Sequence, residues 1–205
     1  MIAVDSSWVT DRTVDDYPVL VAPGQPNLPP NTTADEIVRY SPRKADVINL
    51  DLEDSVPPAE KDAARLLVRN ALLALDWGSS ERMVRVNQGP VGDEDLREIA
   101  GCGVHTVLVP KVEDPQQVVA VAARIDELRA AHGVTAEVLL MPIVESALGA
   151  WRAYEIAAAS DNVVALAIGL EDYTADIGAA RTLAGAESFW ARAQVLNGAR
   201  AAGVQ

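Results

Sequence analysis

The sequence predicts an α/β fold in which helices cover a parallel sheet. Apolar, strand-like runs alternate with helix-like stretches along the chain, which is the pattern of repeated βαβ units. The runs are almost continuously hydrophobic, as strands buried on both faces are. Three of them, at 47–54, 138–145 and 163–172, end in acids. Because the carboxyl ends of parallel strands share one rim where ligands bind, these acids indicate a cation site.

Composition and charge narrow the class of protein. A chain of 205 residues with 49% hydrophobic composition can bury one sizeable core. The formal net charge of −13 argues against a nucleic-acid partner, which would need clustered Lys and Arg. No apolar run reaches the ~20 residues that span a bilayer, and residues 1–18 do not resemble a signal peptide. With Cys102 as the single cysteine, we expect a cytoplasmic protein without a membrane partner.

Six strand–helix units can be assigned in order. Residues 1–16 show no clear period and are expected to form an N-terminal extension, followed by one domain over residues 17–205. The predicted strands are 18–23, 47–54, 83–87, 106–111, 137–145 and 163–172. The predicted helices are 34–40, 59–75, 93–100, 115–132, 147–159 and 187–202.

Local chemistry supports two of the helices. The helix at 115–132 begins with Asp114 as its N-cap and Pro115 at its first position. The helix at 59–75 carries an apolar stripe that can lie on a sheet. The members of this stripe are Ala63, Leu66, Leu67, Ala71 and Ala74.

The number of units leaves two architectures open. Six parallel units could form a doubly wound open sheet. A closed (β/α)₈ barrel needs eight units and typically about 250 residues, whereas the helix at 187–202 runs almost to the last residue. No G-x-G-x-x-G follows any strand, so a dinucleotide-binding open sheet loses support.

Glu145 and Asp172 are the first candidates for chemistry. Each follows a strand on the same expected rim, and Mg²⁺ commonly takes one or two protein carboxylates together with water and substrate. Either acid could instead cap a local helix, Glu145 together with Ser146 and Asp172 at the turn over 173–176. Their occurrence together favours a metal site.

Arg85 is the next candidate, because it lies in an apolar strand where a buried charge is costly unless paired. It could form an ion pair with Glu53 or Glu145, or it could bind a substrate carboxylate, and neither role excludes the other. Nearby, strand alternation places Asp51 and Glu53 on one face and Asp54 on the other.

Lys111 follows Val109 and Pro110 at the end of a strand. It could be a Schiff-base lysine or an ordinary charged residue of the rim. No other feature supports a Schiff base, so we expect the ordinary role. The positions of His105 and His132, before a strand and at a helix end, favour neither metal ligation nor a catalytic triad.

Six motifs follow one another in a known order. They are VLVAPG (19–24), DVINLDLEDSVPPAEK (46–61), VRVN (84–87), VPKVE (109–113), IVESALG (143–149) and GLED (169–172). Their order resembles the citrate lyase beta subunit and malyl-CoA or citramalyl-CoA lyase group of the HpcH/HpaI aldolase superfamily. The resemblance implies a TIM (β/α)₈-type barrel, here apparently truncated after about six βα units. The last two strands are then missing, as is the C-terminal lid that supplies an acid to a neighbouring subunit.

The resemblance also implies a Mg²⁺-dependent carbon–carbon lyase for a hydroxyacyl thioester carried by CoA or an acyl carrier protein, acting as a homo-oligomer. By position, Glu145 and Asp172 look like the metal ligands. Arg85, Glu53 and Asp54 look like catalytic residues, with Arg85 and Glu145 contacting substrate and the two other acids orienting metal-bound water. Mg²⁺ and an arginine would stabilise the oxygen charge of the enolate.

Three other functions stay open. A truncated or non-catalytic member would bind metal and ligand without turnover. A 2-oxoacid aldolase would cleave a free hydroxy acid without CoA. A non-catalytic subunit of a larger lyase complex would co-purify with acyl-carrier or transferase subunits.

Overall fold

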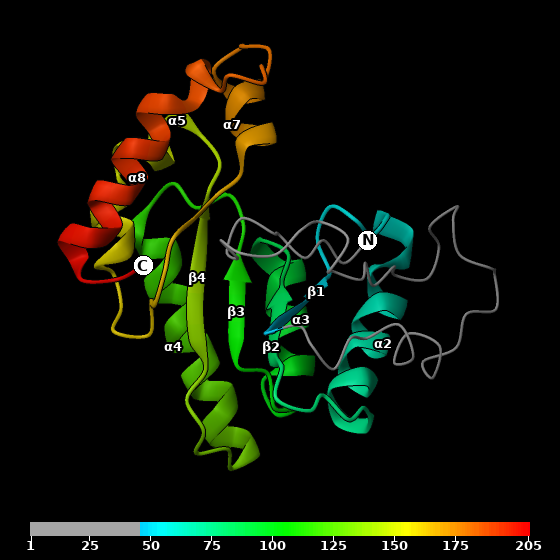
Figure 1. Ribbon diagram of the computed structural model, residues 1–205. Helices are drawn as coiled ribbons and strands as arrows, with labels where there is room; N and C mark the ends of the chain where they lie inside the picture. The colour runs from blue at the N-terminus through cyan, green and yellow to red at the C-terminus, as the bar shows by residue number, and fades with distance from the viewer. Residues whose placement is uncertain (1–45) are drawn as a thin grey trace.

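The computed structural model describes residues 46–205, so the predicted extension at 1–16, strand at 18–23 and helix at 34–40 lie outside the described residues. The described chain is α/β, with five parallel strands that form a curled half-barrel (Figure 1). The strands lie in the order β1-β2-β3-β4-β5, the same order as in the chain. A doubly wound sheet reverses its strand order, so that alternative is wrong.

The five described strands correspond to the last five predicted ones. They are β1 (Val47–Asp51), β2 (Glu81–Arg85), β3 (Thr106–Val109), β4 (Leu139–Val144) and β5 (Ala167–Ile168). The helices are η3 (Pro58–Glu60), α2 (Lys61–Ala74), α3 (Gly89–Ile99), α4 (Pro115–His132), α5 (Ala147–Trp151), α6 (Ala153–Ala157), α7 (Leu170–Asp176), η4 (Ala186–Ser188) and α8 (Phe189–Ala202). The predicted cap of α4 is confirmed, because Asp114 accepts a hydrogen bond from the N–H of Gln116.

The last predicted strand, 163–172, departs most from the expectation. Only Ala167 and Ile168 form β5, and helix α7 already begins at Leu170. Asp172 therefore lies in the first turn of a helix rather than at the tip of a strand. The reason is that a short, continuous apolar run has no period that separates a strand from a buried helix.

The two faces of the sheet differ in what covers them. Helices α2, α3 and α4 lie along one face of the sheet (Figure 1). The aliphatic residues of this face, among them Ile48, Val84 and Val107, belong to the main core. The opposite face carries a small apolar cluster around Met83 and Leu108. Since side chains alternate along a strand, the last residues of β1 and β2 belong to this second face.

The segment before β5 also pairs with the last residue of the chain. Gln205 donates its N–H to the carbonyl of Val164 at 3.0 Å, and Leu166 donates its N–H to the carbonyl of Gln205 at 2.8 Å. This is the hydrogen-bond pattern of a parallel ladder. Among residues 46–205, no helix has the length and apolar character needed to cross a membrane.

Candidate functional site

Arg85 joins the carboxyl ends of the first two strands. It is the last residue of β2 and lies in register with Asp51, the last residue of β1. Its Nε donates to Asp51 Oδ1 at 2.8 Å, and its Nη2 donates to Oδ2 of the same carboxylate. Its Nη1 lies 3.1 Å from Glu53 Oε2. The predicted ion pair with Glu53 is confirmed, but the bidentate contact is with Asp51.

Lys111 has a much larger role than the sequence indicated. Its Nζ lies 2.6 Å from Glu53 Oε1, 3.2 Å from Asp54 Oδ2 and 3.6 Å from Asp172 Oδ2. Its backbone N–H donates to Glu145 Oε1 at 3.0 Å. The residue adopts a φ of 52°, which is uncommon outside glycine. The expectation of a charged residue of the rim is confirmed, and its partners are acids from three parts of the rim.

The turn after Pro110 is held by Gln88, the residue that precedes α3. Gln88 Nε2 donates to the carbonyl of Pro110 at 2.9 Å and to that of Lys111 at 2.8 Å. In the sequence, Lys111 follows Val109 and Pro110 at a strand end and belongs to the motif VPKVE. Strand periodicity says nothing about a left-handed residue beyond that end.

Asp54 joins the same group of acids, contrary to the expected alternation. Strand β1 ends at Asp51, and the chain then turns. In this turn Glu53 donates its N–H to Asp51 Oδ1 at 2.9 Å, and Asp54 donates its N–H to Glu53 Oε2 at 3.0 Å. The two-residue period no longer applies, so all three carboxylates lie toward the basic side chains.

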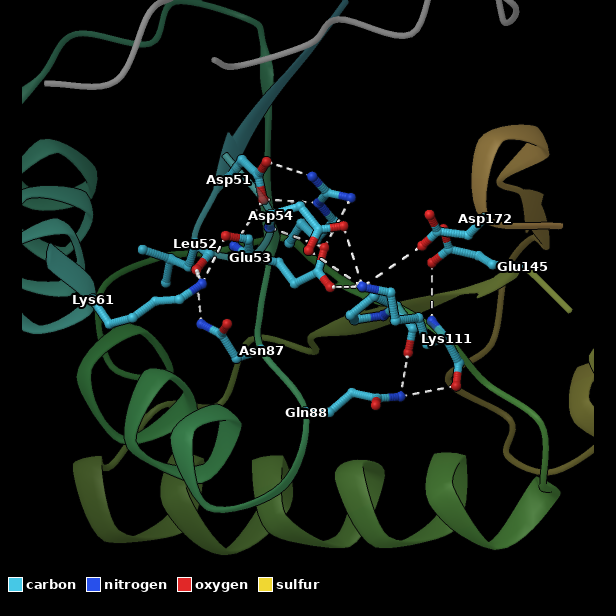
Figure 2. A network of polar contacts seen from close by, with 12 residues as sticks. Asp51, Leu52, Glu53, Asp54, Lys61, Asn87, Gln88, Lys111, Glu145 and Asp172 are labelled. Atoms are coloured by element: carbon cyan, nitrogen blue, oxygen red, sulfur yellow. Dashed lines mark hydrogen bonds and ion pairs between the residues drawn. The ribbon is translucent and has the colours of Figure 1, made fainter. Parts of the chain in front are cut away.

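Glu145 and Asp172 approach from the other side of the rim (Figure 2). Glu145 follows β4 and is 8% exposed. A Cβ atom added at Gly169 would lie 2.3 Å from Glu145 Oε2, so glycine at this position leaves room for the carboxylate. Asp172 extends from α7, the helix that begins directly after this glycine.

The alternative role of Glu145 as a helix cap is wrong, although its neighbour has that role. Ser146 Oγ accepts the N–H of Gly149 at 3.1 Å and caps α5. Asp176 Oδ2 accepts the N–H of Ala147 at 2.8 Å at the same helix end. Glu145 instead accepts the backbone N–H of the Lys111 turn.

The two sides of the rim differ in charge compensation. Burial opposes the ionised form of Asp51, but the hydrogen bonds and charge of Arg85 outweigh it and hold the pKa of Asp51 below its ordinary 3.8. Burial raises the pKa of Glu145 above its ordinary 4.5; the N–H of Lys111 opposes this rise, and the charge of Asp172 adds to it. A cation beside Glu145 would relieve this repulsion.

Glu145 and Asp172 both carry carboxylate oxygens, the ligand type that Mg²⁺ takes, so the two residues could hold such a cation together. Within the part of the chain that the structure describes, no group of three or more His, Cys, Asp or Glu side chains forms a ready metal cage. Mg²⁺ commonly needs no more than one or two protein carboxylates, because water and substrate complete its shell. The observations behind this are the burial of the Glu145 carboxylate, the space that Gly169 leaves for it, and the charge of Asp172 nearby, which opposes its ionisation.

A cavity of about 370 Å³ adjoins this site. Glu53 and Lys111 line it on the side of the rim. Lys61 and Arg65 of α2 and Gln88, which precedes α3, line it elsewhere. Because two residues of the rim also line the cavity, a ligand bound in it would reach the group of acids.

Known proteins resemble this chain in sequence. A model of the HpcH/HpaI aldolase/citrate lyase family matches residues 30–205. The chain is 40% identical over 163 residues to the citrate lyase subunit beta of Leuconostoc mesenteroides subsp. cremoris, which covers 78% of this chain and 54% of the relative. It is 41% identical over 139 residues to the L-malyl-CoA/beta-methylmalyl-CoA lyase of Cereibacter sphaeroides, a match that covers 65% of this chain and 44% of the relative. The chain thus spans about half the length of these curated relatives.

Solved structures share the fold. The citrate lyase beta subunit of M. tuberculosis complexed with oxaloacetate and magnesium superimposes with a TM-score of 0.65 at 31% identity, over 83% of this chain and 71% of that chain. Protein CitE of Mycobacterium tuberculosis in complex with magnesium, acetoacetate and coenzyme A superimposes with a TM-score of 0.64 at 32% identity. The match covers 83% of this chain and 59% of that chain. These findings confirm the resemblance read from the six motifs. The chain belongs to the HpcH/HpaI aldolase/citrate lyase family.

Proposed function

We propose that this chain is a Mg²⁺-dependent carbon–carbon lyase that acts on a malyl-, citramalyl- or citryl-type thioester carried by CoA or an acyl carrier protein. The observation that carries the proposal is the meeting of Glu145, Asp172 and Glu53 around Lys111, beside Arg85. Relatives named as citrate lyase beta subunits and malyl-CoA lyases support the reaction class. A relative solved with magnesium, acetoacetate and coenzyme A supports the cofactor and the carrier.

In this proposal Glu145 and Asp172 hold Mg²⁺, which supplies Lewis-acid stabilisation of a substrate oxygen. In the cleavage the hydroxyl proton passes to water, the C–C bond breaks, and the hydroxyl-bearing carbon becomes the carbonyl of a ketone or 2-oxoacid. The bonding electron pair stays on the thioester fragment as an enolate, which then takes up a proton. Arg85, held in place by Asp51, binds a carboxylate or carbonyl oxygen and stabilises the charge that develops there. Glu53 orients water in the site, because Arg85 and Lys111 fix its carboxylate.

The cavity beside Glu53 and Lys111 gives the non-reacting part of a thioester room next to the rim. A free hydroxy acid would not need this space. The cavity therefore favours a thioester over the 2-oxoacid aldolase alternative, within this proposal.

Turnover of a thioester panel tests the function. The chain is assayed with Mg²⁺ and malyl-, citramalyl- and citryl-CoA, and release of the 2-oxoacid or ketone is measured with and without EDTA. Glu145→Gln and Asp172→Asn should each lower Mg²⁺ affinity by more than about 100-fold and abolish turnover, while the circular-dichroism spectrum is retained. Normal Mg²⁺ binding by either variant would show that the ligand assignment is wrong.

Other outcomes favour the alternatives. Mg²⁺ binding without cleavage of any thioester supports a member without turnover. Equal cleavage of free hydroxy acids supports a 2-oxoacid aldolase. Activity that requires co-purified acyl-carrier or transferase subunits supports a subunit role, and light scattering tests the homo-oligomer implied by the family.

A further inference from the structure

A buried ion pair joins α2 to α3 near the turn that follows β1 and carries Glu53 and Asp54. Asp95 is 0% exposed and Arg65 is 7% exposed. Arg65 Nε donates to Asp95 Oδ1 at 2.8 Å. Well-packed apolar residues of similar volume often stabilise a core as well as such a pair does, so stability alone is a weak reason for it.

The second oxygen of Asp95 connects the pair to the site. Asp95 Oδ2 accepts the backbone N–H of Asn87 at 2.8 Å and its Nδ2–H at 2.7 Å. Asn87 Nδ2 also donates to the carbonyl of Leu52 at 2.7 Å. The amide nitrogen has two hydrogens, and both have acceptors, so the orientation of this side chain is fixed.

Lys61 binds the same turn from the first residue of α2 (Figure 2). Its Nζ donates to the carbonyls of Leu52 and Glu53, each at 2.7 Å. Two successive carbonyls of the turn after β1 are thus bound by side chains of neighbouring elements. The Glu53 carboxylate extends from this fixed backbone to Arg85 and Lys111.

We propose that Lys61 and the chain Arg65–Asp95–Asn87 are positioning residues that hold the Leu52–Glu53 backbone, so that the Glu53 carboxylate meets Arg85 and Lys111. The effect on catalysis rests on the proposed function, whereas the effect on the turn does not. Catalytic groups need to be held within about 0.5 Å of their productive position. Removing outer support of this kind typically lowers activity about 10- to 100-fold.

A second ion pair between the same helices is a matched control. Arg69 Nη1 lies 2.8 Å from Glu98 Oε2, so this pair also joins α2 to α3. The further contacts of these two residues are with Asn70 and with Cys102, not with the turn. If the Arg65–Asp95 pair acted only by joining the helices, the two pairs would have similar effects on the site.

The experiment compares Asp95→Asn and Lys61→Met with Glu98→Gln. The backbone amide NMR signals of Glu53 and Asp54 report the turn, and kcat and KM are measured for a cleaved thioester at saturating Mg²⁺. The first two variants should shift both signals and lower kcat about 10- to 100-fold with little change in KM. Glu98→Gln should change neither the two amide signals nor kcat. Lys61→Arg keeps N–H donors for both carbonyls and should restore most of kcat.

Unchanged amide signals in Asp95→Asn and Lys61→Met would overturn the proposal, and so would equal shifts in Glu98→Gln. If Asp95→Asn does not fold, Lys61→Met decides, because Lys61 lies at the partly exposed start of α2. If the unmodified chain cleaves no thioester, the proposed function fails, and the amide signals still decide whether these residues position the turn.

Discussion

The two sides of the strand-end rim treat their carboxylates differently. On the side of β1–β3, Asp51 and Glu53 lie against the guanidinium and ammonium groups of Arg85 and Lys111. On the side of β4–β5, Glu145 accepts a neutral backbone N–H and has a raised pKa through burial and nearby acids. The first side uses ion pairs to hold its acids in place. On the second side Asp172 lies 3.6 Å from Lys111 Nζ, whereas Glu145 forms no ion pair within residues 46–205, so its charge is available to an external cation.

Arg85→Met should give the largest effect, because it removes the partner of Asp51 on the first side and leaves Glu53 with Lys111. It leaves Asp51 and Glu53, which are 5% and 6% exposed, without the guanidinium. Buried charges without their partner destabilise a fold by about 3–5 kcal/mol. Urea denaturation at neutral pH measures the loss.

Arg97→Met is the control for this change. Arg97 pairs with Asp93 four residues earlier on the surface of α3. Its removal should lower the free energy of unfolding by less than about 1 kcal/mol. Similar losses of unfolding free energy in the two variants would show that the ion pairs at the rim stabilise the fold no more than surface pairs do.

Gly169→Ala should disturb the second side next. The new Cβ would lie 2.3 Å from Oε2 and 2.8 Å from Cδ of Glu145, so the carboxylate has to move. We expect Mg²⁺ affinity, measured by calorimetry, to fall about 10- to 100-fold. Gly198→Ala is the control, because its Cβ would meet Tyr154 N at 2.7 Å, between α8 and α6. Each of the two substitutions should destabilise the fold by about 1–3 kcal/mol, but Gly198→Ala should leave Mg²⁺ affinity unchanged.

The pH dependence of stability should distinguish the two sides by sign. The folded-state pKa of Asp51 is lowered, so its ionised form stabilises the fold above pH 3.8, and this contribution is lost as the pH falls through the folded pKa. The pKa of Glu145 is raised, so its ionisation destabilises the fold as the pH rises from about 4.5 through the folded pKa.

Two variants test these signs by urea denaturation from acid to neutral pH, without divalent cations. Asp51→Asn should lower stability at neutral pH and remove part of the loss below pH 3.8. Glu145→Gln should raise stability at neutral pH, because a neutral amide avoids the cost of a buried charge near Asp172. A stability loss in Glu145→Gln at neutral pH would contradict the contrast between the two sides.

The sequence predicted more of the contacts on the first side of the rim than on the second. The partners Arg85 and Glu53 were predictable, because parallel strands bring their carboxyl ends to one rim. Lys111 was not, since its role depends on a left-handed backbone conformation after a proline, which hydrophobic patterning does not contain. Asp172 was predicted on the correct rim but on the wrong element, because the apolar run before it lacked a period.

Ser146→Ala should have the smallest effect, and it separates helix capping by Ser146 from the proposed metal binding by Glu145. Ser146 Oγ caps α5 through the N–H of Gly149, while Asp176 binds the N–H of Ala147 at the same end. One cap remains, so the free energy of unfolding should fall by only about 0.5–1 kcal/mol. Mg²⁺ affinity should be unchanged, because the Lys111 turn places Glu145. A large loss of affinity would mean that the end of α5, rather than this turn, positions the uncompensated acid.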